Sequence, residues 1–408
     1  MPSRREFLTQ GAIGAALLSL PRLSAAADAL KLQPSELPPG ALESAVLEAL
    51  PGKAALIKRT FRPPNFETPL EYFNDVITPN RVFFVRYHLM NIPQVNERSW
   101  TLKVGGDAAG ATAEFSLSSL LAGFEQVEIV AVCQCSGNRR GMFVPHVPGV
   151  EWGVGAMGNA RWRGVRLRDV LNAVGVNKDA VEVAFDGADS AVHDKTPDFM
   201  KSLPIWRALD ESTLIAFEMN GEPLPHWNGF PARLVVPGWT GTYWVKQLTS
   251  IDVRSQPLKS FWMNPAYRIP RGRFALVDRF TSQETDVSTP ITEMVVNSLV
   301  TNIAPGQRFD AKQWLDVKGI AWDGGYGITR VEVSTDDGAT WRSATLGQDL
   351  GRFSFRQWTY RFAPAQRGRY TVMVRATNRL GATQTFELIH NPAGYHHNVV
   401  QKIPVEAV

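Results

Sequence analysis

Residues 132–140 read Val-Cys-Gln-Cys-Ser-Gly-Asn-Arg-Arg, and they end a mostly apolar run that begins at Gln126. Such a run predicts a buried strand, and Gly137-Asn138 predicts a tight turn directly after it. Cysteines at positions i and i+2 of a strand point to the same side but are poorly placed to form a disulfide. We therefore expect a buried strand that delivers two thiols, followed by a turn that presents two arginines.

Cys133 and Cys135 are the only two cysteines of the chain, which excludes a disulfide framework and a four-cysteine zinc site. Cys133 continues the apolar run and is expected to be a small core residue. Cys135 lies where the strand meets the turn, and Arg139 and Arg140 would favour its thiolate. One thiolate cannot complete a zinc site, but it can bind a metal whose other ligands belong to an organic cofactor.

The composition indicates a soluble globular protein. The chain has 408 residues, of which 44% are hydrophobic and 20% charged, enough for two or three domains. A net charge of +4 is too small for a general nucleic-acid binder.

The N-terminus resembles an export signal. Arg4-Arg5 precedes an apolar stretch over residues 11–20, and Ala25-Ala26-Ala27 offers a cleavage site. The stretch is too short to span a bilayer, so residues 1–27 are predicted to be a twin-arginine signal peptide. The mature protein is then expected to be periplasmic, with no membrane span.

Two regions of different pattern follow. Residues 28–285 predict a mixed α+β domain whose proline-rich first part, residues 28–69, is an extended arm with a short helix over 41–50. Strands are expected over 82–85, 100–104, 126–133 and 234–236, and helices over 117–121 and 167–174. Residues 286–408 have short alternating strands separated by turns, which predict an all-β immunoglobulin-like sandwich.

A glycine motif needs a separate interpretation. Gly153, Gly155 and Gly158 match the dinucleotide-binding pattern, and Asp179 follows at the expected distance of about 20 residues. Residues 161–164 contain a further glycine where that fold needs a long helix. We interpret the motif as a glycine-rich loop.

Residues 135–140 resemble the hallmark of the sulfite oxidase family of molybdopterin enzymes, a strand ending in cysteine, a small residue and Gly-Asn-Arg-Arg. Segments similar to that family recur in order at residues 80–88, 149–164, 220–225, 229–238 and 244–246. The resemblance covers about residues 75–408 and is greatest to bacterial periplasmic sulfite dehydrogenase catalytic subunits. The C-terminal region resembles the family's dimerisation domain.

The resemblance implies a molybdenum–molybdopterin cofactor, with Cys135 as the metal ligand and no haem in this chain. Arg233 and Lys246 would supply the cationic donors that a cofactor phosphate needs. The implied cofactor-binding residues are Phe84, Val85, Arg86, Tyr87, His88, Cys135, Asp189, Asn228, Arg233, Trp244, Val245 and Lys246. The implied catalytic residues are Tyr267, Arg86, Arg140, Trp152 and His88.

Two departures from the animal enzymes matter most. Asn228 stands where they have a histidine, and their third anion-binding arginine maps to Ala393. His396, His397 or another arginine could compensate for that missing charge.

The resemblance implies oxidation of sulfite to sulfate, one-electron transfers to a periplasmic c-type cytochrome, and a homodimer formed through the C-terminal domain. Two alternatives stay open. One is a molybdopterin-dependent reductase of a sulfoxide or another oxyanion, which the C-terminal sandwich disfavours. The other is a non-catalytic periplasmic anion-binding protein in which Cys135 is inert.

Overall fold

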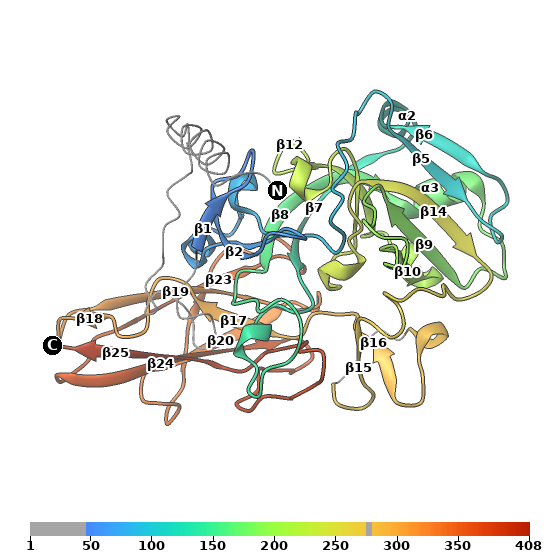
Figure 1. Cartoon of the computed structure of the whole chain (residues 1–408). Coiled ribbons are helices and arrows are strands. Elements are labelled where there is room, and N and C mark those ends of the chain that lie inside the picture. Colours follow the sequence, from blue (N-terminus) through green and yellow to red (C-terminus); the bar gives the residue numbers. More distant parts are fainter. Residues whose placement is uncertain (1–45, 275–279) are drawn as a thin grey trace, which may run out of the picture.

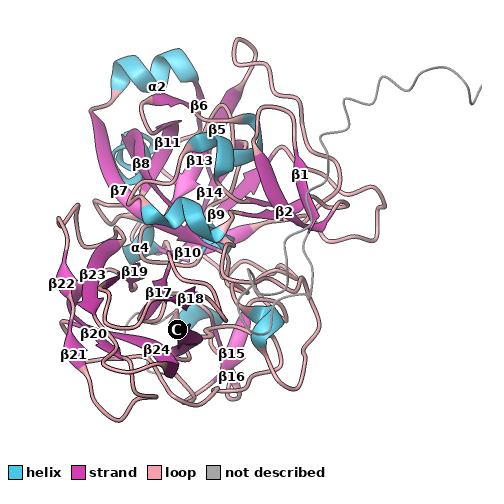
Figure 2. Cartoon of the chain, turned by 90° about the vertical axis from the view of Figure 1, so that its left-hand side faces the viewer, coloured by secondary structure: helices cyan, strands magenta, loops and turns pink. Residues whose placement is uncertain are grey.

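The structure, a computed structural model, describes residues 46–274 and 280–408. The predicted signal peptide and residues 28–45 lie outside the described residues. A larger N-terminal part and a C-terminal β domain lie side by side (Figure 1). Strands dominate and helices are few and short (Figure 2), so the expected α+β character holds only in part. Within the described ranges, no helix has the length and apolar composition of a membrane span.

The described part of the predicted arm, residues 46–69, supplies three strands of a four-stranded antiparallel sheet. Its strands, in order, are β1 (Val46–Ala49), β2 (Ala55–Thr60), β3 (Asn65–Glu67) and β4 (Val85–Arg86). The predicted helix over 41–50 is therefore wrong for residues 46–49, because the turn at Pro51-Gly52 lets β1 pair with β2. The predicted strand over 82–85 is also mostly wrong, because residues Asn80–Val82 form a 3₁₀ turn, η3. This sheet carries Arg86 on β4.

Two larger sheets build the centre of the N-terminal part. One has the order β12 (Glu222–Pro223), β11 (Leu214–Met219), β8 (Met157–Arg166), β7 (Gln126–Gln134), with β13 (Arg233–Val235) paired to β11. The other has the order β10 (Lys201–Pro204), β9 (Glu182–Gly187), β14 (Leu248–Arg254), β5 (Thr101–Gly105), β6 (Ala113–Ser116). Both share one hydrophobic core. The predicted strands over 100–104, 126–133 and 234–236 are confirmed to within two residues.

Both predicted helices are confirmed, as α2 (Leu117–Gly123) and α3 (Leu167–Val174), and a short α4 (Ile205–Ala208) follows β10. Ser116 caps α2 by accepting a hydrogen bond of 3.1 Å from the backbone N–H of Ser119. Helix α3 buries residues 167, 170, 171 and 174, the spacing of one helix face.

The first two glycines of the motif, Gly153 and Gly155, lie in a loop as interpreted, whereas Gly158 lies on strand β8, which begins at Met157. The loop is fixed by Glu67, whose carboxylate accepts hydrogen bonds from the backbone N–H groups of Gly153 and Gly155. Glu67 also pairs with Arg59 at 2.8 Å, and each side chain is only 2% exposed. A buried pair with its remaining lone pairs satisfied holds a backbone segment firmly.

The C-terminal domain consists of two packed sheets, as an all-β domain should. One contains β17 (Asn297–Val300), β19 (Leu315–Trp322), β23 (Arg356–Phe362) and β22 (Thr345–Leu346). The other contains β18 (Arg308–Phe309), β25 (Gln401–Ala407), β24 (Gly368–Asn378), β20 (Ile328–Ser334) and β21 (Arg342–Ser343). Valines from both sheets pack around Trp358 in a common core. A small pair, β15 (Arg268–Pro270) and β16 (Ser288–Pro290), precedes the domain.

The remaining elements are short 3₁₀ turns. They are η2 (Leu70–Asn74), η4 (Arg140–Met142), η5 (His226–Asn228), η6 (Gly241–Tyr243) and η7 (Thr281–Gln283).

The end of β7 is attached to the C-terminal domain. Trp322 Nε1 donates to Gln134 Oε1 at 2.7 Å. Arg139 donates from its two terminal nitrogens to the carbonyls of Val399 (3.2 Å) and Ser298 (2.9 Å). Arg139 therefore does not line the pocket that contains Cys135, because its guanidinium is buried against backbone carbonyls of the C-terminal domain.

Candidate active site

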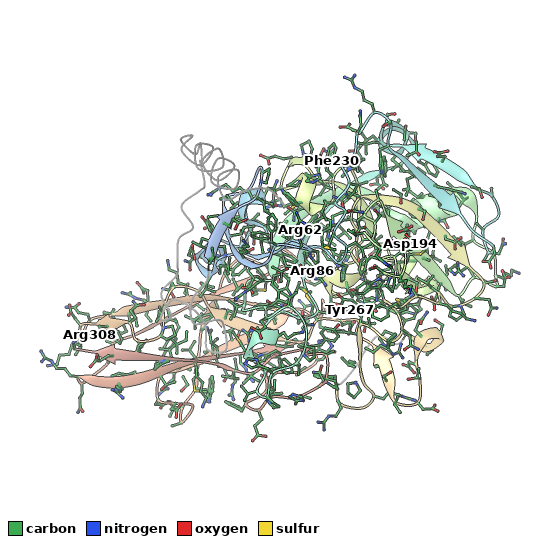
Figure 3. The ribbon with its side chains drawn as sticks, viewed as in Figure 1. Arg62, Arg86, Asp194, Phe230, Tyr267 and Arg308 are labelled. Carbon is green, nitrogen blue, oxygen red and sulfur yellow. The ribbon has the colours of Figure 1, made fainter. Side chains whose placement is uncertain are left out.

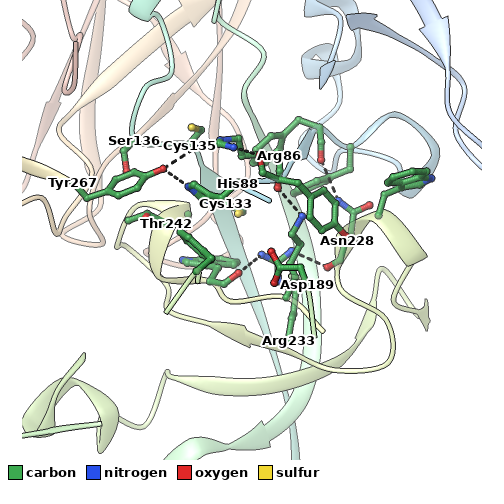
Figure 4. Close-up of a pocket in the computed structure, with 18 residues that line it drawn as sticks. Arg86, His88, Cys133, Cys135, Ser136, Asp189, Asn228, Arg233, Thr242 and Tyr267 are labelled. Atoms are coloured by element: carbon green, nitrogen blue, oxygen red, sulfur yellow. Dashed lines mark hydrogen bonds between the residues drawn. The ribbon is translucent and has the colours of Figure 1, made fainter. Parts of the chain in front are cut away.

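A pocket opens where β4, the end of β7, β13 and the segment after η6 meet (Figure 4). It is lined by Phe83, Phe84, Arg86, Tyr87, His88, Cys133, Cys135, Ser136, Asp189, Phe199, Trp227, Asn228, Arg233, Gly241, Thr242, Trp244, Lys246 and Tyr267. These residues come from segments spread over nearly two hundred positions of the chain, so only the fold brings them together.

Most of the site residues predicted from the sequence line this pocket. Four do not: Val85, Val245, Arg140 and Trp152. Val85, Val245 and Trp152 are buried in hydrophobic cores. The lining residues that the sequence reasoning missed are Phe83, Cys133, Ser136, Phe199, Trp227, Gly241 and Thr242.

Both cysteines face the pocket. Cys135 follows β7 directly, and its backbone N–H donates to the carbonyl of Ala156 at 2.9 Å while its carbonyl accepts from Asn138 N at 2.9 Å. This turn fixes the thiol at the end of the strand. Burial raises the pKa of Cys133 to about 11, so its thiol stays protonated at neutral pH. Cys133 is therefore a core residue, as expected, and also lines the pocket, which the sequence reasoning did not predict.

Tyr267, His88 and Arg86 form a hydrogen-bonded group at one side of the pocket (Figure 4). Arg86 and Tyr267 are also labelled in the view of the whole molecule (Figure 3). The Tyr267 hydroxyl bonds to His88 Nε2 and lies 3.5 Å from Arg86 Nη2. Burial raises the pKa of Tyr267. Burial and the nearby cations Arg86, Lys246 and Lys201 hold the pKa of His88 well below its usual value. A guanidinium only donates, so the Tyr267 oxygen accepts from Arg86, and a neutral His88 with its proton on Nδ1 accepts the Tyr267 proton at Nε2.

Cations outnumber carboxylates in the lining. Arg233 donates to the carbonyls of Asn228 (2.9 Å) and Trp244 (3.0 Å), and Lys246 Nζ donates to the carbonyl of Arg86 (2.6 Å). Among the described residues, none of Arg86, Arg233 and Lys246 has a carboxylate within ion-pair distance. Asp189 is the one acidic side chain lining the pocket, and burial raises its pKa.

This donor set fits an anionic cofactor that brings its own metal ligands. A desolvated surplus of positive charge favours a bound anion, and the Cys135 thiol would be available as one sulfur ligand. In the described part of the chain, no group of three or more His, Cys, Asp or Glu side chains could hold a metal ion by itself. The residues present therefore fit a molybdenum–molybdopterin group, with Cys135 toward the metal and Arg233 and Lys246 toward the phosphate.

A lysine from the N-terminal sheet region supports the pocket. Lys53 Nζ donates to Asn228 Oδ1 at 2.5 Å, to the carbonyl of Asn80 at 2.6 Å and to that of Phe83 at 3.2 Å. Asn228 Nδ2 donates to the carbonyl of Phe84 at 3.1 Å. Because Lys53 occupies the amide oxygen, Asn228 keeps one N–H for a pocket anion. No sequence pattern near Lys53 predicts this contact.

Arg140 lies behind the pocket wall. Its guanidinium donates to the carbonyls of Ala393 (2.9 Å) and Val150 (3.2 Å) and lies over the Tyr395 ring at 5.3 Å. Tyr395 in turn stacks on Tyr267, with ring centroids 5.7 Å apart and planes 7° apart. The turn after Cys135 thus directs Arg140 to the outer side of the tyrosine pair.

His396 and His397 do not compensate for the charge missing at Ala393. Neither residue lines the pocket. Burial lowers the pKa of His396 to about 4 and that of His397 to about 3. Both imidazoles are therefore neutral at physiological pH, and that expectation is wrong.

The chain matches two protein families, one in each of its two parts. Residues 89–262 match the family described as "Oxidoreductase molybdopterin binding domain", and residues 288–408 match "Mo-co oxidoreductase dimerisation domain". The chain is 34% identical to rat mitochondrial sulfite oxidase over 85% of its own length and 65% of the rat protein. It is 32% identical to barley nitrate reductase over 84% of its length and 41% of that protein.

Among solved structures, the sulfane dehydrogenase SoxCD from Paracoccus pantotrophus matches with a TM-score of 0.72. The two chains are 25% identical, and the match covers 84% of each. The two family matches follow one another as the sequence resemblance implies, and the pocket brings Cys135 together with cations for a molybdopterin group. This chain therefore belongs to the sulfite oxidase family of molybdenum–molybdopterin oxidoreductases.

Proposed function

We propose that this protein is a periplasmic sulfite dehydrogenase that oxidises sulfite to sulfate and passes electrons to a c-type cytochrome. The observation that carries the proposal is the meeting of the Cys135 thiol with Arg86, His88 and Tyr267 in one cation-rich pocket. Because the chain spans only 65% of the rat sulfite oxidase, the activity, substrate and partner are all part of the proposal.

The reaction converts sulfite and water into sulfate, two protons and two electrons. When bound, the molybdenum cofactor supplies the two-electron acceptor for the sulfur. Arg86 binds the anion, because its planar fork matches two oxygens of an oxyanion. A cation is required there, since an unpaired anion in a desolvated site is very unfavourable.

Tyr267 and His88 carry one of the two protons, and the second is released to solvent water. The Tyr267 hydroxyl accepts a proton from the substrate side only as it gives its own to His88 Nε2. His88 is neutral at physiological pH and is therefore free to accept. Arg86, 3.5 Å from the Tyr267 oxygen, stabilises partial negative charge on that oxygen during the transfer.

The proposed location and acceptor rest on the sequence. Arg4-Arg5 and the apolar stretch after it support twin-arginine export, which favours an acceptor in the same compartment. The dimerisation domain supports a homodimer.

Two other reactions have specific support. The match to a sulfane dehydrogenase favours oxidation of sulfane sulfur as a second candidate. Oxyanion reduction is the other, because barley nitrate reductase matches over 84% of this chain. That span includes part of the C-terminal domain, so the domain does not disfavour a reductase as the sequence reasoning supposed.

One set of assays separates these reactions. Protein made in a host that synthesises the cofactor would be assayed with sulfite and oxidised cytochrome c, with thiosulfate and cytochrome c, and with nitrate and a reduced dye. We expect turnover with sulfite, and none by Cys135→Ser. Faster turnover of thiosulfate or nitrate than of sulfite would contradict the proposal. Export is tested by Arg4→Lys/Arg5→Lys, which should leave the protein in the cytoplasm.

A further inference from the structure

Lys201 is a buried cation outside the site described above. It is the first residue of β10 and only 1% exposed. It does not line the pocket. Its ammonium lies 4.9 Å from the ring centroid of Tyr267 and 4.6 Å from that of Tyr243. A lysine is almost never fully buried unless it is paired, so this position needs an explanation.

The surroundings of Lys201 do not neutralise its charge. Nζ donates one hydrogen bond, of 2.6 Å, to the carbonyl of Trp262, although an ammonium has three donors. Within the described ranges no carboxylate pairs with it. Two charged groups, Arg268 and Glu182, and one titratable group, the His88 imidazole, face Lys201.

Glu182 is fully engaged elsewhere. Its carboxylate accepts hydrogen bonds from Ser202 Oγ (2.7 Å), Leu258 N (3.0 Å), Ser282 Oγ (2.6 Å) and Gln283 Nε2 (3.0 Å). It therefore has no oxygen left for Lys201. Burial holds the pKa of Lys201 well below its usual value, so a nearby anion would strongly favour the protonated form.

Lys201 contacts the pair that holds the reacting proton. Its ammonium lies over the Tyr267 ring, and Trp262, whose carbonyl it binds, packs its own ring against His88 with centroids 4.8 Å apart. Tyr395 stacks on Tyr267, and Arg140 lies over the Tyr395 ring. Each of the two stacked tyrosine rings therefore has a cation over it, and a desolvated cation over an aromatic face is strongly attractive.

We propose that Lys201 is a specificity-determining positioning residue: its buried charge fixes Tyr267 and adds to the positive potential that selects an oxyanion. The inference rests on the proposed function for its substrate, sulfite. It does not rest on the resemblance, since neither the motifs nor the pocket lining include this lysine. It also gives a source for positive charge that Ala393, His396 and His397 do not provide.

The test compares Lys201→Met, which keeps length and apolar stem but removes the charge, with Lys201→Arg, which keeps the charge. Lys58→Met is the matched control, because Lys58 also lies over an aromatic ring, that of Phe61 at 5.3 Å, but it is ion-paired with Glu48 and does not contact Tyr267 or line the pocket. We expect Lys201→Met to raise KM for sulfite about tenfold, with kcat within about twofold and molybdenum content unchanged. The KM of Lys201→Arg should stay within about threefold of the wild-type KM. The KM of Lys58→Met should equal that of wild type.

Thermal stability separates this role from a structural one. Removing an unpaired buried charge should leave Tm equal or higher, so Lys201→Met should be stable yet bind sulfite weakly. Wild-type KM in loaded Lys201→Met would overturn the proposal. Loss of folded protein in both Lys201 variants would also overturn it, because the lysine would then be structural.

Sulfate binding, measured by the change in tryptophan fluorescence, distinguishes a failure of the proposed function from a failure of this inference. If wild type binds sulfate but does not oxidise sulfite, the proposed function fails while weaker sulfate binding by Lys201→Met still supports this inference. If sulfite is oxidised and Lys201→Met binds sulfate as wild type does, only this inference fails.

Discussion

The ammonium of Lys53 donates a 2.5 Å hydrogen bond to Oδ1 of Asn228, although the two residues lie 175 positions apart. The contact makes the segment before the molybdopterin-binding domain, which begins at residue 89, a part of the cofactor pocket. It also determines that Asn228 offers a donor, not an acceptor, to an anion.

Lys53→Met should therefore weaken cofactor retention, because Asn228 would be free to turn its amide oxygen toward the phosphate. We expect pterin to be lost about tenfold faster during dialysis, as measured by fluorescence of the released pterin. Lys58→Met, at the ion-paired lysine of β2, is the control. Equal retention by both variants would show that Lys53 only anchors the N-terminal sheet.

Arg86→Gln removes the lining guanidinium that contacts Tyr267. Losing a charge-assisted donor should cost about 1.5–3 kcal/mol, which is on the order of 10- to 100-fold in KM for sulfite. Molybdenum content should not change. Compared with Arg86→Gln, Arg140→Gln should raise KM for sulfite less and lower Tm more, since Arg140 binds two backbone carbonyls behind the tyrosine pair. The reverse order in steady-state kinetics would place the anion site on the Arg140 side.

Tyr267→Phe removes only the hydroxyl that bonds to His88 Nε2. If that hydroxyl moves a proton, kcat should fall on the order of 100-fold, while KM stays close to wild type. His88→Gln, which keeps an acceptor but cannot take the proton, should have a similar effect on kcat. Full turnover in either variant would remove the proton step from the mechanism.

Asp186 makes stability depend on pH. Burial, with the like charges of Asp198 and Asp189, raises its pKa to about 7 from 3.8. The folded state thus keeps a proton that the unfolded state loses above about pH 4, so stability falls as pH rises toward and through 7. Asp186→Asn should raise Tm clearly at pH 8 and little at pH 5. The exposed Asp194→Asn should show no such difference, and a uniform Tm change for Asp186→Asn would rule out titration.

The sequence predicted the helices and strands whose signal lies within one short segment. The apolar run at 126–134 forms β7, and residues 167, 170, 171 and 174 form the buried face of α3. The helix expected at 41–50 is wrong at residues 46–49, because these residues pair with β2 across a turn, which helical propensity does not reveal.

In the candidate site, too, residues within recognisable sequence segments were predicted, and residues that matter only through packing were not. Cys135, Arg86 and Tyr267 lie in segments that resemble a family, and they meet in the pocket. Lys53 and Lys201 could not be found that way, because their importance lies in burial without a carboxylate, a property of packing alone. Arg139 and Arg140 were misplaced because both guanidiniums bind backbone carbonyls of distant segments and neither lines the pocket, which the sequence of the turn does not reveal.

The central claim is that Cys135 binds the metal of a molybdenum–molybdopterin cofactor. Molybdenum and pterin content of the purified protein, made in a host that synthesises the cofactor, tests it most directly. We predict about one of each per chain in wild type and in Cys133→Ser, and loss of sulfite oxidation with altered metal content in Cys135→Ser, because a hydroxyl is a poor replacement for a thiolate ligand. Wild-type protein without molybdenum, or Cys135→Ser with full metal content and full turnover, would contradict the account.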